Sequence, residues 1–217
     1  MYVTIRVFLV KVSIKMQLAE CAIIRTGLVL ARKLSEDSQG ECYRLLTLRS
    51  MDPSGYILVD KLDDFWAKEC LPEDCLSQIG DIIVRLTAPH TAILIDESTA
   101  GLLISSNFLI VRIRDERLLP EYLLWLLNSS RVKRSFYSKS RTNTLASINV
   151  KWFLGLDVPM LPTEKQHKVA MVDALVRKET ILLQQLTEIK AKYHELLLER
   201  ISETVYRGVN NDTSYRY

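Results

Sequence analysis

LDVPMLPTEKQ, residues 156–166, divides the chain into two parts of different character. It reads as a short apolar strand closed by Pro159 and Pro162. A helix of about forty residues follows without another proline, and it would span about 60 Å at the usual rise per residue. We therefore predict an α+β chain, with a mixed, β-rich body over residues 17–162 and a long helix over residues 163–206.

The residues at the start of the long helix predict an N-terminal cap, and the pattern of residues along it predicts a coiled coil. Thr163 is a candidate N-cap, with Gln166 as its capping-box partner. Apolar residues then recur at intervals of seven, with a second row between them, as in the seam of a coiled coil. The seam consists of Leu175, Leu182, Leu186, Ile189, Tyr193 and Leu196. Glu179 and Arg200 interrupt the second row, but a single buried helix would show a wider stripe. Because a lone helix would leave the seam in water, we predict a partner helix, from another chain or from a copy of this one.

The two ends of the chain are assigned by composition. Residues 1–16 are interpreted as a leader or an opening strand. Arg6, Lys11 and Lys15 leave only uncharged runs of five residues or fewer, which are too short for a signal sequence or a membrane span. The polar tail over residues 207–217 is expected to be disordered. We expect a cytoplasmic protein without a membrane partner.

Short strands and turns dominate the body. Leu18–Arg25 is either a short helix or a strand, and the composition of residues 63–68 predicts a helical turn. Two helices are predicted over residues 120–128 and 131–137, the first with Pro120 in its opening turn. Strands are predicted from β-branched and alternating patterns at residues 28–34, 43–49, 56–59, 82–86, 91–96 and 108–112.

One stretch of the chain is strongly basic, although the net charge of +3 indicates no partner. Residues 131–142 contain Phe136, Tyr137 and no acid. This stretch is either a solvated face or a surface for phosphate contact. Its cations are Arg131, Lys133, Arg134, Lys139 and Arg141.

No metal site or cofactor is expected. Cys70 and Cys75 form a C-x4-C pair, but a structural zinc site needs a second Cys or His pair, and the three histidines are far apart in sequence. Scattered cysteines in a chain of this size favour reduced, structural thiols.

The sequence also lacks a catalytic set. It contains no P-loop, no glycine-rich dinucleotide turn, no G-x-S-x-G and no H-E-x-x-H. MDPSGY at 51–56 only faintly resembles the Asp-Pro-Pro-Tyr motif of amino-methyltransferases, and a turn explains it better. Asp60, Asp63 and Asp64 form no more than a chance nuclease-like grouping. We therefore predict a binding and assembly protein, not an enzyme.

Several stretches resemble one known family. GDIIV at 80–84 resembles a strand entry of Type I restriction–modification specificity (S) subunits, and SSNFLIVR at 105–112 looks like the next strand of their target-recognition domain. LPEYL at 119–123, followed by LLNS at 126–129, is similar to their P-E-Y-L…L-N-S helix. Residues 147–166 resemble their closing proline-rich element, and the helix after it matches their spacer helix. The likeness extends over about residues 17–203 and lies in the order and spacing of the motifs.

The chain departs from the family pattern at two points. Arg141-Thr142-Asn143-Thr144 stands where a glycine signature often follows the helices. The sequence also has one recognition domain and one spacer helix where a full S subunit has two of each. The resemblance therefore implies a half-length S subunit. It would be either an active subunit or a silent cassette for recombination with another recognition domain.

The resemblance implies sequence-specific binding of double-stranded DNA by a homodimer. Each recognition domain would read one half-site in the major groove, and the antiparallel spacer helices would set the gap between the half-sites. Methyltransferase (M) and restriction endonuclease (R) subunits would be recruited as partners and would supply the catalysis. The predicted DNA contacts are Arg85, Thr87, His90, Lys139, Arg141 and Asn143.

Each predicted contact has a structural alternative. Arg85 is a candidate for a structural ion pair, and Asn143 for a turn residue. The rival function is a coiled-coil assembly protein without DNA specificity, and the second rival is a methyltransferase or nuclease fragment.

Overall fold

The computed structural model describes residues 14–35, 40–140 and 150–212, and the chain divides into two units, Met1–Asp173 and Ala174–Tyr217. The first unit contains three sheets and four short helices, and the second consists of the continuation of one long helix. In the described part of the chain, no helix is long and apolar enough to cross a bilayer.

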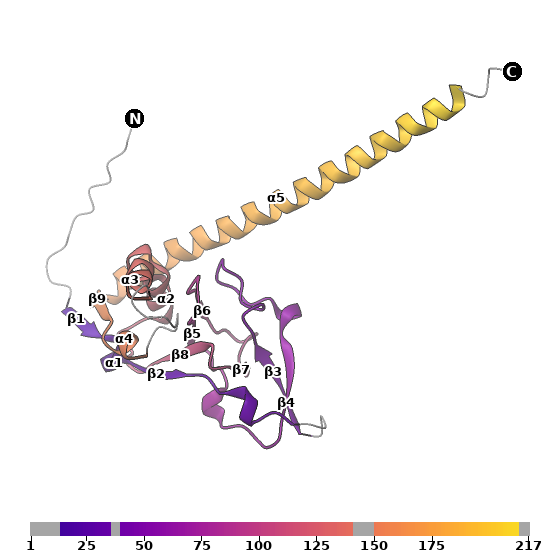
Figure 1. Ribbon diagram of the computed structural model, residues 1–217. Helices are drawn as coiled ribbons and strands as arrows, with labels where there is room; N and C mark the ends of the chain where they lie inside the picture. The colour runs from indigo at the N-terminus through magenta and orange to yellow at the C-terminus, as the bar shows by residue number, and fades with distance from the viewer. Residues whose placement is uncertain (1–13, 36–39, 141–149, 213–217) are drawn as a thin grey trace, which may run out of the picture. The chain divides into compact units, whose positions relative to one another are not determined.

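The central element of the first unit is a four-stranded antiparallel sheet in the order β2-β8-β5-β6 (Figure 1). Both of its faces are covered, because Ile82, Ile83 and Val84 of β5 are all buried. Ile82 and Val84 pack with α2, whereas Ile83 packs with a second core cluster on the opposite face. Its strands are β2 Ala22–Thr26, β5 Ile82–Arg85, β6 Ala92–Leu94 and β8 Phe108–Ile113.

A three-stranded sheet lies beside it in the order β4-β3-β7, with β3 antiparallel to β4 and parallel to β7. Gly27 allows the link between the two sheets, because a Cβ there would come within 2.3 Å of the Ile104 carbonyl oxygen. A third apolar cluster, which includes Leu45 and Phe65, fills this part of the unit. The strands are β3 Glu41–Leu46, β4 Asp63–Ala67 and β7 Leu103–Ile104, and the 3-10 helices are η1 Leu30–Arg32, η2 Val59–Lys61 and η3 Glu73–Cys75.

Helix α2, Pro120–Asn128, has Pro120 in its first turn and buries five of its nine side chains against the sheet. Its last residue protects the edge of that sheet. The Asn128 amide accepts a hydrogen bond from the Ala92 N–H (3.1 Å) and donates one to the Ala92 carbonyl (2.9 Å). The open edge of β6 is thereby satisfied locally by a side chain. The other short helices are α1 Leu18–Cys21, α3 Ser130–Ser140 and α4 Val150–Leu154.

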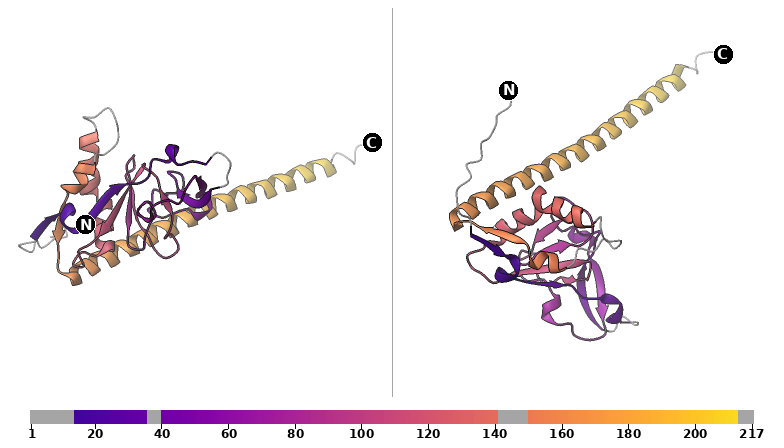
Figure 2. Two further views of the ribbon diagram at one scale, coloured as in Figure 1. Left: turned by 90° about the horizontal axis from the view of Figure 1, so that it is seen from below. Right: turned by 60° about the vertical axis from the view of Figure 1, so that its left-hand side comes forward.

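The stretch LDVPMLPTEKQ lies in the first unit and forms an antiparallel strand followed by the start of the long helix. Strand β9, Asp157–Met160, pairs with β1, Ile14–Gln17, so segments far apart in the sequence lie side by side (Figure 2). Residues 14–16, assigned above to a leader or an opening strand, thus belong to a strand.

Gln166 has a different role from the predicted one. It is completely buried, and its Nε2 donates to the carbonyls of Arg117 (2.7 Å) and Leu161 (2.8 Å). Its Oε1 accepts from the Leu119 N–H (2.9 Å). The capping box with Thr163 is therefore wrong. Gln166 instead binds the first turn of the long helix to the segment before α2.

Helix α5, Thr163–Asp212, begins at the predicted residue and extends beyond the predicted C-terminal limit of the spacer, residue 206. Its first turns belong to the compact unit, because Gln166 and Ala170 are buried there. It includes residues 207–212, which were expected to be disordered. The chain has no proline after 162, and the single Gly208 costs a helix only about 1 kcal/mol.

Three sequence-based assignments in the body are wrong. Residues 63–68 were predicted as a helical turn, but Asp63–Ala67 form strand β4, with Phe65 and Ala67 buried and Trp66 exposed. Residues 28–34 contain η1 with isolated bridges at Leu28 and Leu34, and residues 56–59 form one bridge at Ile57. Leu18–Arg25, left open between helix and strand, contains both α1 and the start of β2.

Candidate nucleic-acid interface

Three of the predicted contacts lie in the turn between β5 and β6. Arg85 is the last residue of β5, and its N–H bonds to the Thr91 carbonyl across the turn (2.9 Å). The His90 N–H bonds to the Thr87 carbonyl (2.9 Å). Two backbone hydrogen bonds therefore close the turn, one at its base and one near its tip, and they fix the positions from which its side chains extend.

Arg85 and Thr87 face each other within this turn. The Arg85 Nε donates to Thr87 Oγ1 at 3.0 Å, and its Nη1 approaches the Leu48 carbonyl at 3.5 Å. Both side chains are half-buried. These two partners of Arg85 are a hydroxyl and a carbonyl, neither of them an acid, so they leave its positive charge uncompensated.

His90 is interior. Only 2% of it is exposed, and its ring lies 5.4 Å from that of Phe136 and 5.5 Å from that of Tyr137, both on α3. Burial lowers the pKa of the imidazole, and the neighbouring cations Lys133 and Arg85 lower that pKa further. The sequence-based expectation that His90 contacts DNA does not fit this position, because the surrounding rings separate its side chain from solvent.

The basic residues near 140 are only partly described. Lys139 lies in the last turn of α3. Arg141 and Asn143 fall outside the described residues.

Helix α3 exposes cations that the sequence analysis did not select as contacts. Its buried face is formed by Val132 and Phe136, four residues apart, so Arg131 and Arg134 are left exposed. Lys133 is half-buried beside them, and burial lowers its pKa. In the sequence, the four-residue spacing of Val132 and Phe136 indicates which face of α3 is buried and therefore which cations are exposed. The result is a cationic helix surface that adjoins the β5–β6 turn through His90.

A hollow of about 350 Å³ lies next to this surface. Arg131 of α3, Lys151 of α4 and the acidic Asp157 of β9 are among the residues that line it. The two cations favour an anionic group in the hollow, whereas the Asp157 carboxylate opposes one.

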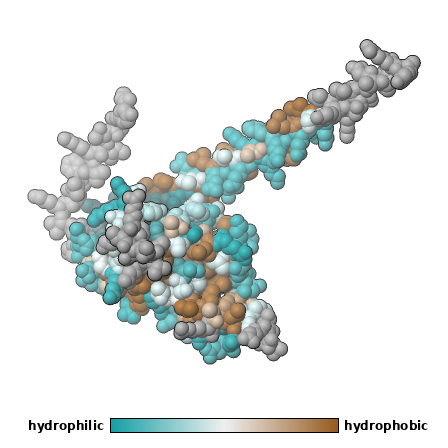
Figure 3. All heavy atoms as spheres, in the orientation of Figure 1, coloured by the Kyte–Doolittle hydropathy of each residue, from teal (hydrophilic) through white to brown (hydrophobic). Residues whose placement is uncertain are grey.

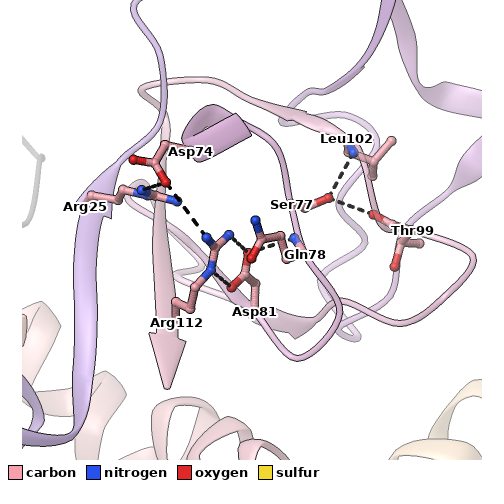
Figure 4. A network of polar contacts seen from close by, with 8 residues as sticks. All are labelled: Arg25, Asp74, Ser77, Gln78, Asp81, Thr99, Leu102 and Arg112. Atoms are coloured by element: carbon pink, nitrogen blue, oxygen red, sulfur yellow. Dashed lines mark hydrogen bonds and ion pairs between the residues drawn. The ribbon is translucent and has the colours of Figure 1, made fainter. Parts of the chain in front are cut away.

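The GDIIV stretch, in contrast, has a structural role at its start (Figure 4). Asp81 is 1% exposed, and its two carboxylate oxygens accept from Arg112 Nε and Nη2, each at 2.7 Å. It also accepts from the Gln78 N–H at 2.8 Å. Asp74 extends the network by pairing with Arg25 at 2.6 Å. These ion pairs hold the loop before β5 onto β8 and β2.

The cysteines form no cluster. In the described part of the chain, no group of three His, Cys, Asp or Glu residues lies close enough to hold a metal ion. All four cysteines are free thiols, and Cys70 is exposed whereas Cys75 is half-buried.

The predicted seam of α5 is exposed in the single chain, and Figure 3 shows apolar patches along this helix among polar ones. Its residues are Leu175, Leu182, Leu186, Ile189, Tyr193 and Leu196, between 46% and 66% exposed. Six large apolar side chains exposed at heptad spacing on one helix are typical of an interface for another helix.

Comparison with known proteins gives a result only at the level of structure. No family model matches the sequence, and no curated protein matches it. Among solved structures, a chain in a structure of complex assembly and conformational transition of the type I R-M system matches with a TM-score of 0.62 at 20% identity. The match covers 84% of this chain and 46% of that one. The HsdS subunit from Thermoanaerobacter tengcongensis matches with a TM-score of 0.55 at 15% identity, over 79% of this chain and 38% of that one.

This chain has the fold of an HsdS subunit. The predicted α+β architecture, with a β-rich part followed by a long C-terminal helix, is confirmed. The chain spans less than half the length of either HsdS-like structure.

Proposed function

We propose that this chain is the DNA-specificity subunit of a Type I restriction–modification system. The observation that carries the proposal is the HsdS fold, matched over 84% of the chain by a component of a type I R-M system. In this role the β-rich unit binds double-stranded DNA. Methyltransferase and endonuclease subunits are its partners and supply the chemistry, for which the chain's own sequence has no recognisable motif.

The cationic face of α3 and the β5–β6 turn support DNA contact at one surface. Arg131 and Arg134 are exposed, and Arg85 has uncharged described partners. Phosphate contacts by such cations position a protein on the duplex, whereas base-edge contacts supply the sequence preference. Lys139 and Arg141 remain predicted phosphate contacts, Asn143 remains a predicted base contact, and Thr87 is a further candidate on the turn.

The exposed seam of α5 supports a homodimer. A second copy of α5, running antiparallel, would cover the six seam residues and relate two identical readers by a two-fold axis. Such a dimer recognises an inverted repeat whose gap depends on the length of the helix.

The test is selection of bound sequences from a pool of random duplexes by the purified chain, alone and with candidate methyltransferase subunits. We expect enrichment of an inverted repeat with one fixed gap. In titrations against the selected duplex, the double variant Arg131→Ala with Arg134→Ala should bind more weakly. It should also reduce the slope of log K against log salt by about two, because each phosphate contact contributes about 0.9.

The matched control is the double variant Lys61→Ala with Lys68→Ala, which removes two exposed cations outside α3. It should leave the slope unchanged. If no duplex binds at low ionic strength, with or without partner subunits, the DNA-binding proposal is wrong and the coiled-coil assembly protein becomes the better explanation.

A further inference from the structure

His90 combines three properties that rarely occur together. Its φ is +55°, in the left-handed region that few residues other than glycine adopt. Its side chain is 98% buried and lies against two aromatic rings of α3. Among the described residues its Nδ1 is a buried atom without a hydrogen-bond partner. A strained backbone and an unsatisfied polar atom both cost free energy, so the surrounding contacts must compensate for them.

The compensating contacts all connect one turn to one helix. Phe136, the nearer of the two rings, is itself buried and packs on Trp152 and Phe153 of α4 with ring centroids at 4.3 and 5.0 Å. His90 therefore joins the β5–β6 turn to an aromatic cluster that fixes α3. Lys133 on α3 and Arg85 on β5 are close enough to act on the charge of His90. The imidazole is thus near cations from two separate elements.

The imidazole itself cannot add a contact to DNA. Its ring is covered by protein, and burial together with the two neighbouring cations lowers its pKa. Any influence of His90 on DNA binding must therefore pass through the residues that it positions.

We infer that His90 is a positioning residue that sets the cationic face of α3 against the β5–β6 turn, so that Lys133 and Arg85 engage one DNA backbone together. This inference rests on the proposed DNA-binding function and deepens it. In this view, the buried contact between His90 and the rings of α3 holds the two elements together. The half-buried cations Lys133 and Arg85 are then kept in a fixed relation to each other.

The salt dependence of binding tests the inference, because the buried His90 cannot reach a phosphate itself. His90→Gly removes the ring and relieves the left-handed backbone, whereas His90→Phe keeps a ring of similar shape. We expect His90→Gly to bind the selected duplex about tenfold more weakly, with a slope reduced by about one, as for one lost phosphate contact. His90→Phe should bind within about threefold of the wild type with an unchanged slope. Circular dichroism at the assay temperature verifies that each variant is folded.

A double-mutant cycle identifies the residue through which His90 acts. If His90 positions Lys133, the loss from Lys133→Ala should be smaller in the His90→Gly background than in the wild type, because the contact is already gone. Additive losses would overturn the inference. So would a His90→Gly variant with the wild-type slope, since the residue would then serve only the backbone of the turn.

Two further outcomes are separable. If His90→Gly does not fold, Tyr137→Ala removes one of the two ring contacts without changing the turn, and a wild-type slope in that variant would overturn the inference. If the wild-type chain binds no duplex at all, the proposed function fails and the inference fails with it. Failure of the inference alone leaves wild-type binding intact.

Discussion

Asp81 has a structural role within a motif that the sequence analysis used only for its resemblance to a family. It is buried and bound to Arg112 by two hydrogen bonds of 2.7 Å. A buried carboxylate is tolerated only with such partners, because an unpaired charge in the interior costs several kcal/mol. The aspartate that follows Gly80 therefore supports the loop, and the contacts with DNA are proposed for the opposite end of β5.

Replacing Asp81 by Ala should strongly destabilise the first unit. The change leaves the Arg112 guanidinium partly buried without its main acceptor, and we expect a loss of about 3–5 kcal/mol in the free energy of unfolding. Chemical denaturation followed by fluorescence measures it. The control is Asp64→Ala, which breaks a pair with Arg44 whose two side chains are more than half exposed, and which should cost at most about 1 kcal/mol. Equal losses in the two variants would contradict a structural role for the buried pair.

Among the secondary-structure elements, those with a local signal could be predicted and those defined by distant pairing could not. The sequence showed β5 through its β-branched run and α2 through Pro120 and its apolar spacing. It did not show β7, because two residues, Leu103–Ile104, become a strand only by pairing with β3. Strand β4 was missed because two of its five residues are acids, and only the sheet reveals which of its side chains are buried.

The candidate interface follows the same rule. The basic face of α3 could be found from composition and from the spacing of Val132 and Phe136. The burial of His90 could not, because it depends on contact between a turn and a helix about 45 residues further along the chain. The place of His90 in the loop after a predicted strand made it a candidate for binding, and its burial in the structure does not fit that role.

The seam of α5 should be required for self-association. We expect Leu182→Lys with Ile189→Lys to convert a dimer into a monomer, because each lysine would place a charge in an apolar helix–helix contact. Analytical ultracentrifugation gives the mass. The matched control is Gln184→Lys with Ala191→Lys, which has the same seven-residue spacing on the opposite side of the helix and should leave the dimer intact. A dimer that persists in the seam variant would place the interface elsewhere.

At the scale of the whole molecule, the length of α5 predicts the gap between the two half-sites of the DNA target. If two readers are joined by antiparallel copies of α5, a longer helix should separate the half-sites further. Duplicating residues 183–189 adds seven residues, or about 10.5 Å of helix, and turns the seam by only about 20°. At about 3.4 Å per base pair, the gap in the selected inverted repeat should widen by about three base pairs.

A five-residue duplication of residues 186–190 is the control for this experiment. It also lengthens α5 but turns the seam by about 140°, so the two copies can no longer pair along their apolar faces. We expect it to remove the fixed gap, and the seven-residue duplication to keep one. If both insertions leave the gap of the wild type, α5 does not measure the distance between half-sites, and the reader and the helix serve separate purposes. A gap that changes only with the seam in phase would connect the heptad pattern in the sequence directly to the spacing of the DNA target.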